Sequence, residues 1–437
     1  MSTKKLFISV PNLDRHLRKL TLDIGERLAG SSGEKKAADY LAREFQRCGA
    51  EVSVETFPVK QRWVKEQKLW LKLGGGTWKS FPCSLISSTP GTDGKVLEAP
   101  LIFFEAPTGY QCRDLSFLKG KAVVHLGTHI ESRDAYRRLI KANPLFILIV
   151  DVRYPGTRPL ADGMLPSYTK DIGSVPMVNV AFMDAWRWKE KGASKARLLV
   201  DGGMRPSISQ NVVATLPGNG QEDGVIYFGA HHDTQADSVG ADDNASGSVG
   251  LLELARVLAR KPRKKTIRLI SFGAEEQLSV GSAVYVRKHR RQLSQGNGMM
   301  INLDSYGSLM GWNELICNGS GKMLQTVLPY FGKRKLFAEV ITEVLPYYDL
   351  FPFVAAGIPG ISVGRKNCIC GRFFHHRPDD DITKLSVPLM ASLLQAVADL
   401  AGDMANTHKL PFPSDIPKEQ LRQVQRFWRD LYGGWNG

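Results

Sequence analysis

The hydrophobic and polar positions change rhythm along the chain. From about residue 206, apolar segments of strand length alternate with longer segments in which apolar residues recur every three or four positions, as on one face of a helix. Such alternation is typical of a mostly parallel or mixed sheet covered by helices on both sides. The predicted strands contain VIYFGA, TIRLISFGA, MMINLD, ELICNG and PGISVG, and the predicted helices are 244–260, 280–293, 321–332 and 386–404.

Two further patterns precede this part. Residues 33–48 predict a helix, because Ala38, Leu41 and Phe45 fall on one face. Residues 62–205 carry many short strand signals, interrupted by only one or two short helices, notably 132–142. We therefore expect an α/β protein with three layers (αβα), in which helices flank the central sheet and a β-rich domain is inserted.

The same changes of pattern predict the domain boundaries. A length of 437 residues is too great for one ordinary hydrophobic core. The end of the chain has Leu421, Val424, Trp428 and Leu431 on one face, which predicts a helix that either docks on the body or forms a homodimer. The predicted segments are 1–61, the first part of the main domain; 62–205, the inserted domain; 206–405, the rest of the main domain; and 406–437, the tail.

Composition narrows the class of protein. Apolar residues make up 43% of the chain, an ordinary value for a globular protein, which excludes general disorder. The first largely apolar run, Leu6–Val10, is too short for the core of a signal peptide. The longest apolar run, 145–150, is far below the roughly 20 residues that cross a bilayer. We therefore expect a cytoplasmic protein without a membrane partner.

The net charge of +15 raises the question of a polyanionic partner. Basic clusters occur at 261–265, 287–291 and 333–335. Each borders a predicted helix end or a loop, where cations are favourable in any case. No aromatic stripe accompanies the clusters, so the sequence predicts no nucleic-acid partner.

The six cysteines are too scattered for a disulfide framework. Cys368 and Cys370 form a close pair shortly before His375. A CxC pair alone is a weak metal signal. We expect these two thiols to have a structural role beside the site described next.

Imidazoles and carboxylates follow the predicted strand ends. In an α/β sheet, the carboxyl ends of the strands are where ligands bind. Four of the nine histidines stand in two adjacent pairs at such positions. The side chains that follow the strand ends are His231, His232, Asp233, Asp242, Asp243, Glu275, Glu276, Asp304, His375, His376, Asp379 and Asp380.

This donor set predicts a dinuclear metal site. Imidazole and carboxylate without thiolate suit zinc, and also fit cobalt or manganese. Two neighbouring dications repel each other, and a bridging carboxylate and a bridging water relieve the repulsion. Asp233 is placed to accept a hydrogen bond from the ring of His231, and Glu275 to act as general base. Two histidines, two aspartates and a glutamate from this set meet the ligand count of such a site.

Five ordered motifs resemble the dizinc aminopeptidase family, whose relatives include glutamate carboxypeptidase, the transferrin receptor and the glutaminyl cyclases. The motifs are GAHHDT…GADDNASG, GAEEQLSVGS, INLDSYG, YYDLFPF and FHHRPDD. The resemblance covers about residues 15–60 and 206–405. The segment 62–205 resembles, less strongly, the protease-associated domain that such enzymes often carry as an insertion.

The resemblance implies a distribution of ligands over two zinc ions. Asp243 would bridge the ions, and the peptide bond after it would be cis. His231 and Asp304 would bind one zinc ion together with Asp243. Glu276 and His376 would bind the other.

The resemblance also implies roles beyond the metal ligands. Glu275 would be the general base, and Asp349 would line the substrate pocket. Many family members have a tyrosine just before the last ligand that donates to the transition-state oxyanion. Here His375 takes that place, so the donor is either His375 itself or one of Tyr347 and Tyr348.

We therefore expect a metal-dependent aminopeptidase that cleaves N-terminal residues from peptides with a free N-terminus. A bridging water on two zinc ions would attack, and Glu275 would pass its proton to the leaving amine. A zinc carboxypeptidase or amidohydrolase is an alternative that arginines aimed at a substrate carboxylate would mark. A glutaminyl cyclase normally lacks the insertion. A non-enzymatic binding protein on the same scaffold would have lost ligands, whereas all five are present.

Overall fold

The chain folds into two compact units in a computed structural model. The strands β1 (Glu51–Lys72) and β8 (Lys195–Leu216) contribute residues to both units. Unit 1 consists of residues 1–59, 208–374 and 378–437, and unit 2 of residues 60–207 and 375–377. The structure describes residues 7–130, 132–154, 156–293, 298–368 and 372–436.

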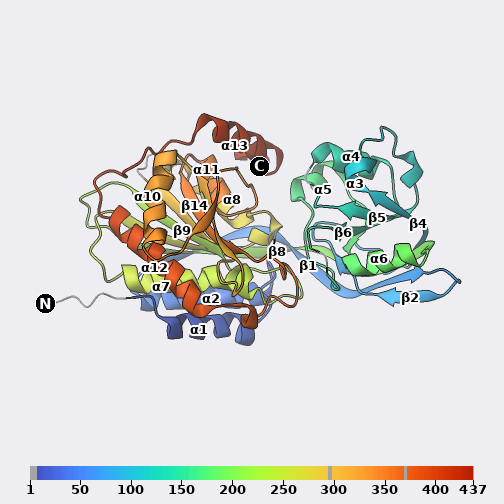
Figure 1. Cartoon of the computed structure of the whole chain (residues 1–437), viewed down its shortest axis with the longest axis horizontal. Coiled ribbons are helices and arrows are strands. Elements are labelled where there is room, and N and C mark those ends of the chain that lie inside the picture. The colour runs from blue at the N-terminus through green and yellow to red at the C-terminus, as the bar shows by residue number, and fades with distance from the viewer. Residues whose placement is uncertain (1–6, 131, 155, 294–297, 369–371, 437) are drawn as a thin grey trace. The chain divides into compact units, whose positions relative to one another are not determined.

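Unit 1 is built on a mixed sheet (Figure 1). Its strands, besides the end of β8, are β9 (Val225–His231), β10 (Thr266–Phe272), β11 (Met299–Leu303), β12 (Trp312–Asn318), β13 (Ala338–Ile341) and β14 (Gly360–Lys366). The order is β13-β12-β14-β11-β9-β10-β8. The four central strands β14, β11, β9 and β10 are parallel, whereas β12 and β8 run antiparallel to β14 and β10. The carboxyl ends of β11, β9 and β10 therefore lie next to one another.

Helices cover both faces of this sheet. One face carries α7 (Gly247–Leu258), against which α1 (Val10–Arg18), α2 (Ser32–Arg47) and α12 (Val387–Met404) pack, with α10 (Gly321–Gly332) on α12. The other face carries α11 (Leu350–Ala355), which contacts α8 (Val280–Lys288) and α13 (Lys418–Asp430) (Figure 1). The short helix α9 (Arg290–Leu293) follows α8. Both α7 and α12 are buried along most of their length, because each packs against several other elements.

Unit 2 has its own sheet and core. The strands β4 (Leu97–Glu105), β5 (Ala122–Gly127), β6 (Phe146–Asp151) and β7 (Met177–Asn179) are parallel, and β3 (Ser84–Leu85) pairs antiparallel with β7. β2 (Trp78–Phe81) forms a hairpin with β1. The helices are α3 (Ala106–Gly109), α4 (Arg133–Lys141), α5 (Pro166–Ile172) and α6 (Phe182–Glu190). The core includes the fully buried Trp188.

The predicted α/β class with a mixed sheet between helices is confirmed. The long periodic segments are also helical, with ends within a few residues of those predicted. The predicted helix 280–293 is interrupted at His289, which separates α8 from α9. Residues 62–205 contain more helix than expected: α6 begins inside VPMVNVAF, a segment predicted as strand, and only Met177–Asn179 of it is extended.

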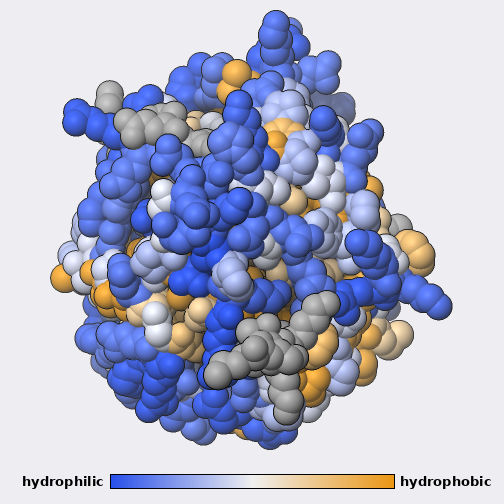
Figure 2. Space-filling view, turned by 90° about the vertical axis from the view of Figure 1, so that its left-hand side faces the viewer, coloured by the Kyte–Doolittle hydropathy of each residue, from blue (hydrophilic) through white to orange (hydrophobic). Residues whose placement is uncertain are grey.

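The face of the molecule drawn in Figure 2 is mostly polar. Figure 2 shows a largely hydrophilic face on which hydrophobic residues form small, scattered groups. The core clusters account for this distribution, because most large apolar side chains are buried in them. In the described part of the chain, no helix is both long and apolar enough to cross a membrane.

Candidate metal centre

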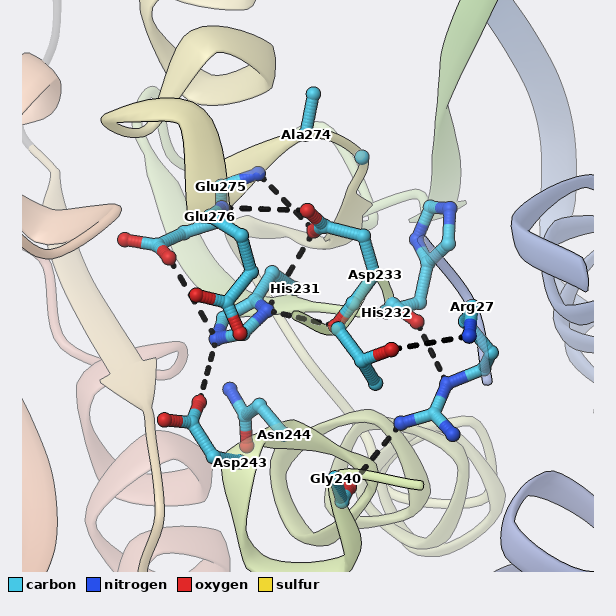
Figure 3. Close-up of polar contacts among 12 residues, drawn as sticks. Arg27, His231, His232, Asp233, Gly240, Asp243, Asn244, Ala274, Glu275 and Glu276 are labelled. Atoms are coloured by element: carbon cyan, nitrogen blue, oxygen red, sulfur yellow. Dashed lines mark hydrogen bonds and ion pairs between the residues drawn. The ribbon is translucent and has the colours of Figure 1, made fainter. Parts of the chain in front are cut away.

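The predicted side chains converge at the carboxyl edge of the unit 1 sheet. His231 is the last residue of β9, and Glu275 follows the neighbouring strand β10 after a turn at Gly273–Ala274. Asp304 follows β11 on the other side of β9. Because the three strands are parallel neighbours, these groups come together at one edge of the sheet. Figure 3 shows His231 next to Asp243 and Glu275.

His231 lies at the middle of the carboxylates. Its Nε2 is 3.2 Å from Asp243 Oδ1, 3.8 Å from a carboxylate oxygen of Glu275 and 4.0 Å from Asp304 Oδ1. One possible ligand atom each of His231, Asp243 and Glu276 lie within 4.8 Å of one another. These distances are suitable for ligand atoms that share a cation, since metal–ligand bonds near 2 Å put such atoms a few ångströms apart.

Asp233 connects the two neighbouring strand ends. Its carboxylate accepts hydrogen bonds from the backbone N–H groups of Glu275 (3.0 Å) and Glu276 (3.2 Å). The Nδ1 atom of His231 lies 3.5 Å from Asp233 Oδ1 and 3.2 Å from the Asp233 backbone oxygen (Figure 3). Asp233 thus fixes both the imidazole ring and the turn that carries the two glutamates.

The loop that carries Asp243 is held from several sides. The Asp243–Asn244 peptide bond is cis, as the resemblance implies. The carboxylate of Asp380 accepts from the backbone N–H of Asp242 (2.8 Å) and of Asp243 (3.0 Å). The Asn244 amide donates to Leu303 O and accepts from the N–H group of Gly247, the first residue of α7. These bonds fix the position of the Asp243 carboxylate.

Arg27 supports the same loops, although no sequence motif indicated this residue. Its side chain is fully buried and donates to the carbonyl oxygens of His232 (2.8 Å), Val239 (2.7 Å) and Gly240 (3.1 Å). His232 itself faces away from the ligands and contacts Ser271 Oγ at 2.9 Å. It is therefore a wall residue rather than a ligand.

The glutamate turn has an unusual backbone. Ala274, Leu278 and Ser279 all have positive φ angles (53°, 72° and 47°), a region that non-glycine residues rarely adopt. This conformation brackets Glu275 and Glu276. The Ser279 hydroxyl donates to Glu275 Oε1 at 3.0 Å, so the turn also orients the carboxylate.

The charges in the site are perturbed by burial. Burial raises the pKa of Glu275 well above its usual value and also raises that of Asp304. Burial alone would lower the pKa of His231, but the surrounding carboxylates, Glu275 foremost, raise it well above its usual value. Burial raises the pKa of Asp349 to about 7. The site thus brings several buried carboxyl groups together, and a bound cation would favour their ionised form.

Arg372 is a second contact that the sequence did not indicate. Its guanidinium is 3.0 Å from Asp243 Oδ2 and 3.8 Å from Asp304 Oδ1. Burial would lower the pKa of Arg372, but the charges of Asp243 and Asp304 raise it. The cationic side chain thus contacts two of the predicted metal ligands.

The comparisons with known proteins agree with this geometry. Residues 211–401 match the model of peptidase family M28. This part of the chain belongs to peptidase family M28. The expectation that the chain is a peptidase enzyme is confirmed by this assignment.

Relatives of the M28 segment extend the similarity over most of the chain. Aminopeptidase YwaD of Bacillus subtilis is 27% identical over 430 residues, which cover 95% of this chain and 89% of the relative. Human carboxypeptidase Q is 25% identical over a segment that covers 87% of this chain and 83% of the relative. The fold is similar to that of a zinc aminopeptidase from Bacillus subtilis (TM-score 0.74, 23% identity, 95% and 100% covered). It is also similar to a peptidase M28 precursor from Shewanella amazonensis (TM-score 0.77, 20% identity, 94% and 96% covered).

The remaining predicted residues lie in different places. Asp349 is buried beside the centre, at 1% exposure, directly before α11. Tyr347 is 36% exposed. His375 and His376 belong to unit 2 by their contacts, where their rings stack 3.5 Å apart and His376 Nδ1 lies 3.9 Å from Asp162 Oδ1.

Three further acidic residues of these motifs differ in their exposure. Asp237 is exposed. Asp242 is instead fully buried and accepts a hydrogen bond from the N–H group of Gly307 (2.8 Å). Asp379 is partly buried. Of the two thiols predicted to stand beside the site, Cys368 is half-buried and Cys370 lies outside the described residues.

Proposed function

We propose that this chain is a zinc aminopeptidase that hydrolyses the first peptide bond of peptides with a free N-terminus. The observation that carries the proposal is the convergence of one imidazole and several carboxylates within a few ångströms in a buried site of an M28 chain. The aminopeptidase relative from Bacillus subtilis supports the choice of activity.

The residues present fit a pair of divalent cations. The donors are nitrogen and oxygen without sulfur, which suits zinc and also admits cobalt or manganese. We propose that Asp243 contacts both ions, with His231 and Asp304 at one position and Glu276 and His376 at the other. The assignment of His376 rests on its place in the motif FHHRPDD. When bound, the ions would polarise the scissile carbonyl and make the attacking water more acidic.

Glu275 is the general base in this proposal. Its carboxylate is buried beside His231, and burial raises its pKa, which makes it a stronger base than an exposed carboxylate. It then delivers that proton to the nitrogen of the leaving amine. Asp233 keeps the turn and the imidazole in place during this transfer, because it bonds to both.

The substrate would be held by groups at the rim and floor of the centre. We propose that the buried Asp349 attracts the free α-amine, because it adds negative charge beside Glu275. The oxyanion donor is His375, Tyr347 or Tyr348. A blocked N-terminus would remove the charge that Asp349 recognises, and an aminopeptidase of this kind should therefore reject N-acetylated peptides.

Arg372 favours a second candidate, a carboxypeptidase or dipeptidase on the same centre. A buried guanidinium beside the metal ligands is suited to bind a substrate carboxylate. The similarity to human carboxypeptidase Q agrees with this alternative. In this case the enzyme would require a free C-terminal carboxylate rather than a free amine.

One experiment separates the two candidates. Purified protein is loaded with zinc and its metal content is measured. It is then assayed on a dipeptide, its N-acetyl form, its C-terminal amide and aminoacyl p-nitroanilides. Loss of cleavage on N-acetylation alone supports the aminopeptidase, and loss on amidation alone supports the carboxypeptidase.

The variant Asp243→Asn tests the centre itself. It should bind less zinc and lose activity, because one side-chain oxygen of Asp243 becomes an amide nitrogen. Asp237→Asn, an exposed change on the same loop, is the matched control and should retain both properties. Full activity of Asp243→Asn, or of chelator-treated wild type, would rule out the proposal.

A further inference from the structure

Side-chain oxygens hold the first four backbone N–H groups of the glutamate turn, residues 273–279. Gly273 donates to Asn211 Oδ1 at 3.2 Å, and Ala274 donates to Glu34 Oε1 at 3.1 Å. The next two N–H groups donate to the carboxylate of Asp233 (Figure 3). The acceptors come from β8, from α2 and from the segment directly after β9. Three separate parts of unit 1 therefore determine the course of this turn.

Glu34 is the fully buried member of this set that belongs to a helix, and it lies 240 positions before the turn. Its Oε1 accepts from the Ser209 hydroxyl at 2.6 Å as well as from Ala274. Its Oε2 accepts from the N–H group of Gly30 at 2.7 Å. All three partners donate, which is the arrangement that suits a carboxylate. The side chain thus ties α2 and β8 to the residue directly before Glu275.

Helix capping accounts for only one of the two Glu34 oxygens. Ser31 is the N-cap of α2, and its hydroxyl accepts from the Glu34 N–H group at 3.2 Å. A glutamate three residues after such a cap commonly reaches back to the start of its own helix, as Oε2 does toward Gly30. Oε1 instead leaves the helix and contacts Ser209 and Ala274. This second contact adds nothing to the helix start.

The turn requires support at the place where Glu34 contacts it. Ala274 has a φ angle of 53°, which residues other than glycine rarely adopt, and such a backbone persists only where its surroundings hold it. The packing there is also close. A Cβ atom on Gly273 would lie 2.3 Å from Ser209 Oγ and 2.8 Å from Glu34 Oε1. The backbone therefore lies directly against the side chains of Glu34 and Ser209.

We propose that Glu34 is a positioning residue for Glu275. Its Oε1 atom holds the N–H group of Ala274, and this contact fixes the backbone from which the Glu275 carboxylate extends beside His231. Asp233 holds the two residues that follow. The inference rests on the proposed role of Glu275 as base. It assigns α2, which contains none of the five sequence motifs, a part in the site.

The test compares Glu34→Ala, Ser209→Ala and the double variant, each loaded with zinc. Ser209→Ala leaves Glu34 in place and removes the hydroxyl that donates to the same oxygen. Ser31→Ala is the matched control, because it removes a hydrogen bond from the same helix start but leaves Oε1 untouched. Steady-state kinetics on the preferred substrate give kcat and KM per folded molecule, and thermal unfolding gives the stability.

Glu34→Ala should lower kcat by roughly thirtyfold, with KM within about twofold of wild type, because the loss of a supporting contact typically costs about 10–100-fold in activity. Ser209→Ala should lower kcat roughly threefold, the lower end for one hydrogen bond. The double variant should be within about twofold of Glu34→Ala, because Ser209 acts through Glu34. Ser31→Ala should lose stability, as on loss of an N-cap, but should keep kcat within about twofold.

A wild-type kcat in folded Glu34→Ala, or an equal loss of kcat in Ser31→Ala, would overturn the inference. If Glu34→Ala does not fold, Ser209→Ala decides the question, and an unchanged kcat in that variant would overturn it.

Crystal structures of wild type and Glu34→Ala, both grown with zinc, supply a readout that does not depend on turnover. The backbone at Ala274 and Glu275 should shift in the variant, and an unmoved turn would overturn the inference. If wild type cleaves none of the substrates, the proposed function fails, whereas these two structures still decide whether Glu34 holds the turn.

Discussion

At the scale of single residues, the centre is a balance between buried charges. Carboxylates crowd around one imidazole, and Arg27 and Arg372 are the buried cations closest to them among the residues that the structure describes. Arg27 uses its donors on backbone oxygens and therefore shapes loops. Arg372 contacts the carboxylates directly. Arg27 therefore supports the loops of the site, whereas Arg372 offsets the charge of its carboxylates.

Glu275→Gln should lower kcat by about a thousandfold, because the amide cannot accept the proton of water. Zinc content should remain that of wild type, since Glu275 is not among the proposed ligands. Steady-state kinetics and elemental analysis on the same preparation check this. An active Glu275→Gln variant would show that another group is the base.

Arg372→Met should raise the affinity for zinc roughly tenfold, because a guanidinium beside Asp243 and Asp304 competes with a cation for the same oxygens. The metal-free variant should unfold at a lower temperature, since it leaves buried carboxylates without a partner. Competition with a chromogenic chelator measures the first effect and calorimetry the second. Weaker zinc binding by the variant would contradict this account.

The sequence was most informative where chemistry follows a strand end. His231, Glu275 and Asp304 were identified because parallel neighbouring strands bring their carboxyl ends together. Arg27 and Arg372 could not be identified in this way. Their partners are backbone oxygens or carboxylates distant in sequence, and only the folded chain defines them.

At the scale of elements, the long helices were predicted more completely than the short ones. The long helices α2, α10 and α12 were predicted nearly to the residue, because several turns of periodic burial are hard to mistake. Helices of nine residues or fewer were predicted less completely: the predicted helix 132–142 matches α4, whereas α1, α6 and α11 were not predicted. In α6, Trp186 and Trp188 are residues common in strands, and the burial of Trp188 in the unit 2 core outweighs that preference.

Acid should destabilise α1 through His16. This residue is 4% exposed, and its Nδ1 lies 2.5 Å from the Tyr40 hydroxyl. Burial, aided by Arg15, lowers its pKa from 6.5 to about 4. Between these values the unfolded chain binds a proton that the folded chain does not, so stability falls as the pH decreases through this window.

Below pH 4, the lowered pKa of His16 reduces the free energy of unfolding by roughly 3 kcal/mol. His16→Gln should therefore lose less stability than wild type between pH 7 and pH 4.5. Urea unfolding at several pH values measures the difference. Equal pH dependence of the two proteins would show that His16 does not contribute.

At the scale of the whole molecule, metal and stability should be linked. The folded chain brings candidate ligands together from separate segments, and the unfolded chain does not, so zinc should bind the native state selectively. At a free zinc concentration a thousand times Kd, the native state gains about 4 kcal/mol. Removal of zinc by a chelator should lower the unfolding temperature by roughly 5–10 °C.

Calorimetry with and without chelator checks this expectation. Zinc added back should restore the original transition. Magnesium should not, because it prefers six oxygen ligands in an octahedral arrangement. A transition that is indifferent to the chelator would mean that the native state holds no tightly bound metal.

Because β11, β9 and β10 lie side by side, zinc binding at the centre depends on the correct alignment of these strands. A slip of β9 by one residue would turn His231 to the opposite face of the sheet and break the ligand set. Misaligned chains, even if compact, would therefore not bind the cation. Zinc affinity can thus serve as a sensitive count of correctly assembled molecules after refolding or after substitutions far from the centre.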